Sequence, residues 1–272
     1  MKKSLTNRPS FLVFVIILFI ISLFILDKKS VALKETGSIH PTTLVAHAGG
    51  AIYGFRHTNA LEALEESYSN GFQLIEIDFE WTSDGKVVAI HDWEPMVRRL
   101  FMTEPKVLSL KEFKELKVFQ DLTLIDLDDL VNWLKTKDDV YIVTDMKTDN
   151  LKFLRLISES YKDIQNQIIP QVYSFEEYAP ARDMGYENVI LTLYKTDYED
   201  ERIVKFAEEN SVFAITMPID RGYSNLPRML KDIDVFTYVH TVNELYIFEE
   251  LYENGVSGIY TDYFHANRFP IS

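Results

Sequence analysis

Short apolar runs of strand character alternate with amphipathic helical patterns along most of the chain, and this alternation constrains the fold more than any other feature. The strand-like runs begin at Thr43, Gln73, Lys86, Val140, Ile168, Asn188, Val212, Val235 and Ser257. Because helical patterns separate most of them, the strands are expected to be parallel. About eight repeats over roughly 230 residues favour a closed (β/α)8 TIM barrel over an open sheet, as one domain over residues 42–272.

One connection is too short for a parallel crossover. Only the residues SDGK separate the run "EIDFEWT" from the run "VVAIHD". A parallel crossover needs about a dozen residues, so this pair must form a hairpin or a sharp fold-back around Asp84-Gly85. Asp-Gly is a favoured two-residue hairpin loop, and with that loop Asp78 would lie directly opposite His91.

The first strand of this hairpin alternates acidic and apolar residues. Glu76, Asp78 and Glu80 share one face, which an ordinary solvated strand face would also explain. The opposite face carries Ile75, Ile77, Phe79 and Trp81. Asp145 is another acid at the carboxyl end of an apolar strand, and in barrels these ends converge on one pocket. Glu76, Asp78 and Asp145 would then form an all-oxygen cluster, suited to Ca²⁺ or Mg²⁺ rather than Zn²⁺.

Two histidines stand at strand ends. His47 closes the first strand and is followed by two glycines, although a satisfied core histidine is the commoner fate of a single His. With His91, it supplies the ingredients of acid–base chemistry near neutral pH. The pair Asn59 and Glu62 fits a helix capping box. Comparable settings are not evident for His40, His57, His240 and His265, although His240 ends a strand and would line the pocket.

The N-terminus carries sixteen apolar or near-apolar residues, 11–26, preceded by Lys2, Lys3 and Arg8. This pattern favours an N-terminus inside and the remainder outside the membrane. The segment is either an uncleaved anchor or a signal segment that is cleaved near "SVA". We therefore expect a cytoplasmic N-terminus, a transmembrane anchor or signal segment, a stem and an extracytoplasmic domain, which is secreted if the segment is cleaved. Their ranges are 1–10, 11–26, 27–41 and 42–272.

Charge and cysteine content restrict the partners. The formal net charge is −14, so the protein repels a phosphate polymer on average and nucleic acid is not expected as a partner. The absence of cysteine excludes a disulfide framework and a lipid-attachment cysteine. Nothing in the sequence indicates an obligate protein partner. The N-terminal segment predicts the membrane as the surface to which the chain attaches.

Six pieces of the sequence resemble the glycerophosphodiester phosphodiesterases, relatives of phosphatidylinositol-specific phospholipase C. They are "AHAGG", "TNALEA", "GFQLIEIDFEWTSDGKVVAIHD", "LSLKEFKEL", "DMK" and "GVSGIYTD", and they extend from His47 to Asp262. The E-x-D, T-x-D-G and H-D elements in this spacing carry the specificity. The resemblance implies a distorted TIM barrel, a divalent cation, and hydrolysis of a small phosphodiester or a glycerol-phosphate polymer.

Carried over position by position, the resemblance implies an acid/base pair of histidines, acidic metal ligands and a phosphate-contacting lysine. These roles fall on His47 and His91, on Glu76, Asp78 and Asp145, and on Lys147. The family usually has glutamate at the third ligand position. Which histidine is the acid, and whether water or a substrate hydroxyl attacks, stays open.

The sequence departs from the family pattern in two places. Ala48 stands where the family has arginine, and Thr58-Asn59-Ala60 stands where it has Glu-Asn-Thr. Arg56, on the same loop, is the candidate that restores the lost positive charge at the phosphate. These departures keep a second interpretation open, in which the barrel is a non-catalytic cell-surface binding module. A glycosidase with paired carboxylates is a third, but it gives the histidines no role.

Overall fold

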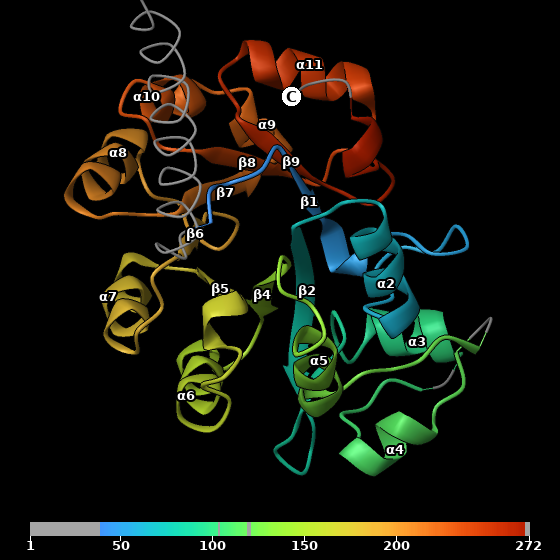
Figure 1. The fold of residues 1–272 in the computed structure, drawn as a ribbon. Helices are drawn as coiled ribbons and strands as arrows, with labels where there is room; N and C mark the ends of the chain where they lie inside the picture. Colours follow the sequence, from blue (N-terminus) through green and yellow to red (C-terminus); the bar gives the residue numbers. More distant parts are fainter. Residues whose placement is uncertain (1–38, 103, 119–120, 270–272) are drawn as a thin grey trace, which may run out of the picture. The chain divides into compact units, whose positions relative to one another are not determined.

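Nine strands form one sheet in the computed structural model, which describes residues 39–102, 104–118 and 121–269 (Figure 1). The strands are β1 (Leu44–Ala46), β2 (Leu74–Trp81), β3 (Val87–Ala89), β4 (Tyr141–Met146), β5 (Ile168–Val172), β6 (Ile190–Thr192), β7 (Ala214–Pro218), β8 (Thr237–His240) and β9 (Gly258–Thr261). Each falls within one of the runs expected from the sequence. All except β3 pair in parallel, and β1 joins both β9 and β2, so the barrel closes. The predicted (β/α)8 barrel is therefore confirmed.

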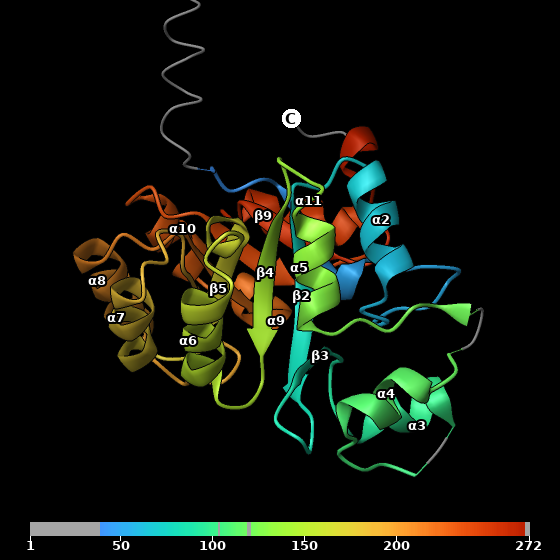
Figure 2. The same ribbon diagram turned by 60° about the horizontal axis from the view of Figure 1, so that its bottom comes forward.

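Helices surround the strands on the outside of the barrel (Figures 1 and 2). The α-helices are α2 (Leu61–Ser69), α3 (Pro95–Phe101), α4 (Leu110–Glu115), α5 (Leu127–Leu134), α6 (Asn150–Ser160), α7 (Phe175–Asp183), α8 (Asp200–Glu209), α9 (Ile219–Gly222), α10 (Leu226–Lys231) and α11 (Leu245–Glu253). Short 3₁₀ helices are η1 (His47–Gly49), η3 (Gln165–Gln167) and η4 (Ala266–Arg268). One large apolar core joins the outward faces of the strands to these helices.

Alternation along β2 places its acidic face inside the barrel. Ile75, Ile77 and Phe79 are fully buried and belong to the core shared with the helices. Because successive side chains of a strand point to opposite faces, Glu76 and Asp78 point into the barrel interior, where both are buried. The prediction that the acids share one face and the apolar residues pack against helices is confirmed.

The hairpin between β2 and β3 differs from the prediction by one residue. Trp81 pairs with Val87, and Thr82 closes the loop by bonding to Lys86, with Gly85 at a φ of 73°. The loop therefore has three residues and a glycine bulge, rather than the two-residue Asp84-Gly85 loop. Every cross-strand pair shifts by one as a result.

The expected pairing of Asp78 with His91 is therefore wrong. Ile90 lies opposite Asp78 instead, and its amide donates to the Asp78 carbonyl over 3.1 Å. Because β3 ends at Ala89, the chain is free to turn after it, and this turn rather than the strand pleat sets the position of His91.

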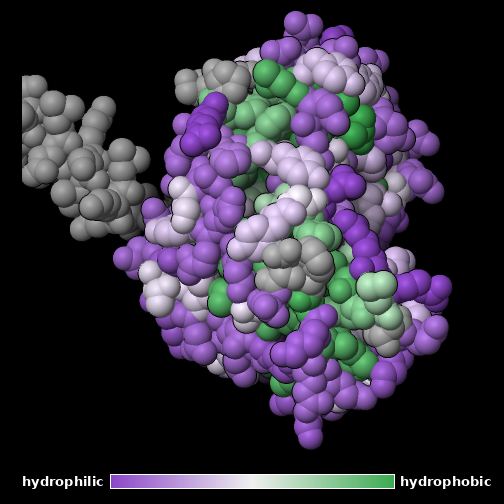
Figure 3. Space-filling model, turned by 90° about the vertical axis from the view of Figure 1, so that its right-hand side faces the viewer, coloured by the Kyte–Doolittle hydropathy of each residue, from purple (hydrophilic) through white to green (hydrophobic). Residues whose placement is uncertain are grey.

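A second, smaller apolar core lies beside the barrel. It joins β3 to α3 and α4, which stand outside the ring of helices in Figure 2. Met96, Val97 and Phe113 are buried in it, whereas Met102 at the end of α3 is 92% exposed. Figure 3 shows apolar side chains among hydrophilic ones on this face of the molecule. The segment between β3 and α5 thus packs as a unit of its own against the barrel.

The predicted N-terminal elements 1–10 and 11–26, and most of the stem 27–41, lie outside the described residues. Among the helices of the described part, none is long and apolar enough to cross a membrane. The described residues from Pro41 onward make up one compact unit.

Candidate active site

Three carboxylates meet at the carboxyl ends of β2 and β4. Asp78 and Asp145 are register partners in the parallel pair, and Glu76 lies two residues before Asp78 on the same face. One oxygen from each of the three acids lies within 4.8 Å of the others, and all three residues are buried. The sheet register therefore gathers the predicted ligands. An all-oxygen donor set of this kind fits a hard divalent cation.

The charges of the cluster are only partly offset by the protein. Burial and the charges of Asp78 and Asp145 raise the pKa of Glu76 to about 8, although His47 and Lys147 act in the opposite direction. Burial also opposes ionisation of Asp78, but the nearby cations, Lys147 above all, hold its pKa below the ordinary value. One of the three acids is thus protonated unless a further positive charge enters, which supports a cation site here.

Lys147 lies between two of the acids. Its Nζ is 3.1 Å from Oδ1 of Asp78 and also bonds to Asp145. Burial disfavours the ammonium, but these two carboxylates raise the pKa of Lys147 above its ordinary value. The predicted phosphate-contacting lysine is therefore charged and at the cluster.

Asn59 fixes the position of Asp78. Its side-chain NH₂ donates to Oδ2 of Asp78 over 3.0 Å, and its side-chain oxygen accepts from the Asp78 amide over 3.0 Å. The capping-box prediction is wrong, because α2 begins after Ala60 and Glu62 instead bonds to Thr123. The side chain of Asn59 bonds to the buried Asp78 and not to the start of the helix.

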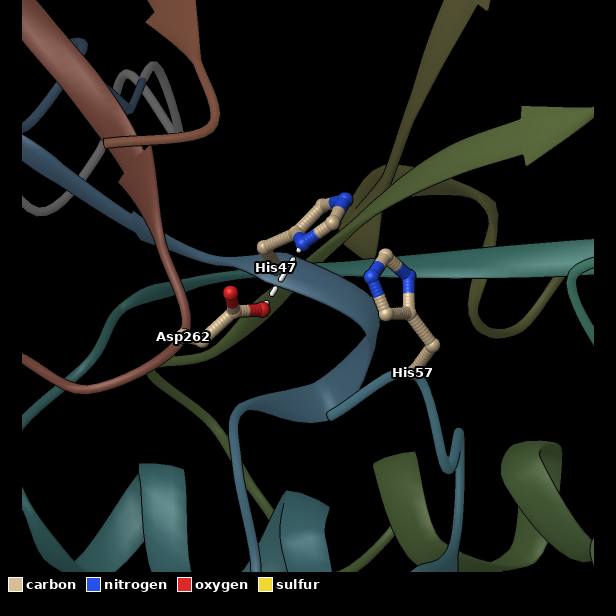
Figure 4. A group of neighbouring side chains, drawn as sticks. All are labelled: His47, His57 and Asp262. Atoms are coloured by element: carbon tan, nitrogen blue, oxygen red, sulfur yellow. Dashed lines mark hydrogen bonds and ion pairs between the residues drawn. The ribbon is translucent and has the colours of Figure 1, made fainter. Parts of the chain in front are cut away.

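His47 is held by an aspartate from the last strand (Figure 4). Ala46 and Thr261 are register partners of β1 and β9, so the next residues, His47 and Asp262, lie side by side at the barrel mouth. Nδ1 of His47 is 2.9 Å from Oδ1 of Asp262. Burial lowers the pKa of His47, but Asp262 and the acidic cluster outweigh it and raise the pKa to about 9. Sequence reasoning missed Asp262, although it ends a strand just as Asp145 does.

His91 has an aspartate partner of its own. Its Nδ1 is 2.6 Å from Oδ2 of Asp92, and the other oxygen of Asp92 accepts from the amides of Glu94 and Met96. The start of α3 therefore fixes the carboxylate that orients the histidine. In both His47 and His91 an aspartate occupies Nδ1, so Nε2 is the nitrogen left for proton exchange.

His57 is a third histidine at the same place, which sequence reasoning set aside. Its ring centroid lies 4.8 Å from that of His47 and 5.4 Å from that of His91, nearly perpendicular to both. The loop that carries it has a left-handed backbone at Ala48, Tyr53, His57 and Asn59. Such a loop conformation has no periodic signal, so the sequence pattern could not place His57.

The remaining residues of the site complete its wall. The hydroxyls of Tyr173 and Tyr194 both donate to Asp145. His240, which the sequence places at a strand end, packs its ring 5.7 Å from that of Tyr194. Arg56 is half-exposed at the rim, with its guanidinium 3.7 Å from Oδ2 of Asp262. The tyrosines were missed because neither belongs to a recognisable motif.

All of the predicted site residues thus lie around one mouth of the barrel. One oxygen from each of the three acids lies within 4.8 Å of the others, and Lys147 is paired with Asp78 and Asp145. His47 and His91 both make ring contacts with His57, and the guanidinium of Arg56 lies 3.7 Å from the aspartate that holds His47. The geometry brings the residues together and leaves their roles as proposals.

Comparisons with known proteins point to one family. The model of the glycerophosphoryl diester phosphodiesterase family matches residues 49–266. A curated relative, lysophospholipase D GDPD3 from Mus musculus, is 31% identical over 101 residues, which span 37% of this chain and only 29% of that relative.

Solved structures share the barrel. The glycerophosphodiester phosphodiesterase from Thermotoga maritima has a TM-score of 0.63 at 21% identity, and the match covers 83% of this chain and 96% of that chain. The phosphodiesterase from Oleispira antarctica, solved with the product sn-glycerol-3-phosphate, has a TM-score of 0.64 at 15% identity over 84% and 95% of the two chains. At these identities the likeness concerns the fold.

The family match covers most of the chain and includes β2, the hairpin, β4 and β9. It confirms the resemblance drawn from the motifs and the expected enzyme class, the phosphoric diester hydrolases. The chain belongs to the glycerophosphoryl diester phosphodiesterase family.

Proposed function

We propose that the protein hydrolyses a glycerophosphodiester-type substrate by acid–base catalysis with two histidines. The observation that carries this proposal is the pairing of each histidine with an aspartate at Nδ1, beside three buried acids. The amide of Ala48 donates to Glu76 over 2.7 Å, so the backbone that carries His47 is bonded to the acidic cluster. Such an arrangement suits transfer of protons at a polarised phosphodiester.

Glu76, Asp78 and Asp145 would hold the divalent cation, for which we propose Ca²⁺ or Mg²⁺. When bound, such a cation supplies positive charge to the phosphate and offsets the negative charge that develops during hydrolysis. Tyr173 and Tyr194 orient Asp145 toward the site through their hydroxyls. This support fits an aspartate, whose side chain is shorter than the glutamate usual in the family.

We assign the proton donor to His47 and the proton acceptor to His91. His47 keeps its proton at neutral pH because Asp262 and the acidic cluster surround it, so it can protonate the leaving alcohol. His91 is about one-third exposed and can take a proton from an attacking water or substrate hydroxyl.

A leaving-group comparison tests this assignment. His47→Ala should lose about 10²–10⁴-fold in turnover on glycerophosphocholine but much less on bis(p-nitrophenyl) phosphate, because nitrophenolate leaves without a proton. His91→Ala should lose about the same on both substrates. The opposite pattern would exchange the two roles, and near wild-type turnover in both variants would reject them.

Lys147 and Arg56 are the proposed phosphate contacts. Lys147 already stands at two of the acids, and Arg56 is half-exposed above Asp262, where an entering phosphate would meet it. Arg56→Ala should raise the KM for a phosphodiester with a smaller effect on kcat. Unchanged kinetics in Arg56→Ala would remove this residue from the substrate site.

The substrate class and location extend the same proposal. Glycerol-phosphate polymers, lysophospholipids and free glycerophosphodiesters all present the required phosphodiester, and the Mus musculus relative is named a lysophospholipase D. We further propose that the barrel lies outside the cytoplasm, anchored or released through residues 11–26. Protease accessibility on intact cells tests the location, since digestion only after lysis would contradict it.

Activity with and without EDTA separates an enzyme from a binding module. Metal-dependent release of a phosphomonoester supports the hydrolase: glycerol phosphate from a glycerophosphodiester or a glycerol-phosphate polymer, or acylated glycerol phosphate from a lysophospholipid. Binding without turnover, at any Ca²⁺ or Mg²⁺ concentration, would support the alternative of a non-catalytic surface module. The pair His47–Asp262 favours the enzyme, because a histidine oriented by a carboxylate is not needed to bind a ligand passively.

A further inference from the structure

His57 has no assigned role, yet it completes a second group of possible metal ligands. One donor atom from each of His47, His57 and Asp262 lies within 4.8 Å of the others. In Figure 4 the rings of His47 and His57 and the carboxylate of Asp262 point toward one another from three separate segments of the chain. Two imidazole nitrogens and one carboxylate oxygen differ in chemistry from the all-oxygen cluster nearby, because they suit borderline-soft ions.

The surroundings of these three residues resemble the support that metal ligands receive. The side chain of Asn243 donates to Oδ2 of Asp262 over 2.7 Å and accepts from the Asp262 amide over 2.8 Å, so the carboxylate is held in place. Such outer hydrogen bonds orient ligands toward a metal. Oδ1 of Asp262, which faces His47, is the oxygen that remains for coordination.

His57 is placed at a cost that its present contacts do not explain. Its backbone is left-handed, with a φ of 58°, which costs on the order of 1 kcal/mol for a non-glycine residue. Its Nδ1 is buried and has no hydrogen-bond partner among the described residues. No hydrogen bond at this nitrogen therefore accounts for the strained placement of the ring. Coordination of an ion through the other ring nitrogen, which faces His47 and Asp262 in Figure 4, would account for it.

The dimensions are close to those of a zinc site. Zinc bonds of about 2.0–2.1 Å in a tetrahedron place donor atoms about 3.4 Å apart. Oδ1 of Asp262 and Nδ1 of His47 are 2.9 Å apart, and the third donor is no farther than 4.8 Å from either. A shift of the His57 ring by at most about 1.4 Å would therefore bring its donor nitrogen to the separation of a zinc site.

We propose that His47, His57 and Asp262 form a second metal site, which takes Zn²⁺ or a similar late first-row ion and keeps the enzyme inactive while it is occupied. Coordination through Nδ1 takes the place of one proton of the His47 imidazolium. The ring is then neutral, and its remaining Nε2–H is too weak an acid to protonate the leaving alcohol. The inhibitory part rests on the proposed function, whereas the binding site itself does not.

Calorimetry on the metal-free full-length protein tests the site. With Mg²⁺ in saturating excess to fill the oxygen cluster, the wild type should still bind one Zn²⁺ at this site. His57→Asn should weaken that binding at least about 10–100-fold, and asparagine tolerates the left-handed backbone at this position. Asp262→Asn is the second variant and should weaken it comparably. His40→Asn, which removes a histidine outside the site, should not change it.

Glu76→Gln separates the two metal sites. If the inference is correct, this variant loses Mg²⁺ affinity and keeps the Zn²⁺ site. Equal Zn²⁺ affinity in the wild type and His57→Asn, loss of the Zn²⁺ site in Glu76→Gln, or no Zn²⁺ binding under excess Mg²⁺ would each overturn it.

Turnover of the Mg²⁺-loaded wild type should fall with Zn²⁺ at the concentration that calorimetry gives for its binding. Zn²⁺ bound at this site with undiminished turnover would overturn the inhibitory part. If the protein hydrolyses no phosphodiester, the proposed function fails, and the calorimetry still decides whether the second site exists.

Discussion

Replacing Asn59 by glycine tests the most buried hydrogen-bond pair of the site. Asn59 is fully buried, and its side chain makes two hydrogen bonds to Asp78. The substitution leaves the Asp78 amide without a partner, at about 1–3 kcal/mol, and removes a bond to a charged carboxylate, worth about 1.5–3 kcal/mol. Glycine adopts the φ of 49° without strain, so backbone strain adds nothing to the loss of stability. We expect a loss of about 3–5 kcal/mol in the free energy of unfolding.

Urea unfolding in EDTA measures this loss, because the bound cation would otherwise add its own binding energy to the native state. With a slope of about 3 kcal/mol per molar for a chain of this size, the midpoint should fall by about 1–1.7 M. The free energy of unfolding of Asn59→Ala should be lower than that of Asn59→Gly by about 1–2 kcal/mol, which is the cost of a left-handed backbone at a residue with a Cβ atom. The affinity for Mg²⁺ should fall about 10–100-fold, because Asn59 orients Asp78.

Asp234→Gly is the matched control. Asp234 also has a left-handed backbone, with a φ of 58°, but it is exposed at the end of α10. Glycine at this position should change the unfolding free energy by less than about 0.5 kcal/mol. If Asn59→Gly were as mild as Asp234→Gly, the two hydrogen bonds to Asp78 would not stabilise the fold, and the reasoning would be refuted.

Three further predictions follow from the same contacts. Glu76→Gln should require at least about 100-fold more Mg²⁺ for half-maximal hydrolysis, and an unchanged Mg²⁺ titration would contradict the cluster as the cation site. Because the pKa of His47 rises from 6.5 to about 9 on folding without metal, its stabilisation is present below pH 6.5 and is lost as the pH rises through 9. Asp262→Asn should flatten this dependence of stability on pH, which thermal unfolding in EDTA between about pH 6 and about pH 9 measures. If stability changed with pH as steeply as in the wild type, the pair His47–Asp262 would not be its cause. Gly85→Ala should cost about 1 kcal/mol, since its φ is 73° and a Cβ would meet nothing within 4 Å, while hydrolysis rates stay at the wild-type level.

The barrel and its acidic cluster could be predicted because both depend on regular periods. A side-chain period of two puts Glu76 and Asp78 on one face whatever the register, and parallel strands bring Asp145 to the same end of the barrel. Asp262 obeys the same rule at the end of β9 and was within reach of the same reasoning. Its partner His47 was predicted as a site residue. The bond between the two could not be predicted, because it depends on the pairing of β9 with β1 that closes the barrel.

The hairpin register and the 48–59 loop could not be predicted in the same way. One additional loop residue, Ser83, shifts every pair of the hairpin, and sequence preference does not separate a two-residue Asp-Gly loop from a three-residue loop with Gly85 in the bulge. The loop before α2 has no repeat at all, so its left-handed residues and the place of His57 are decided by what the loop packs against.

The sequence by itself determined the alternation of strands and helices, the inward acids and the family, because these depend on local spacing along the chain. The tertiary structure decided which aspartate holds each histidine, that Asn59 bonds to Asp78 rather than to a helix end, and that the ring of His57 contacts those of His47 and His91. Those contacts join segments up to 215 residues apart, and only the closed barrel fixes the distances between them.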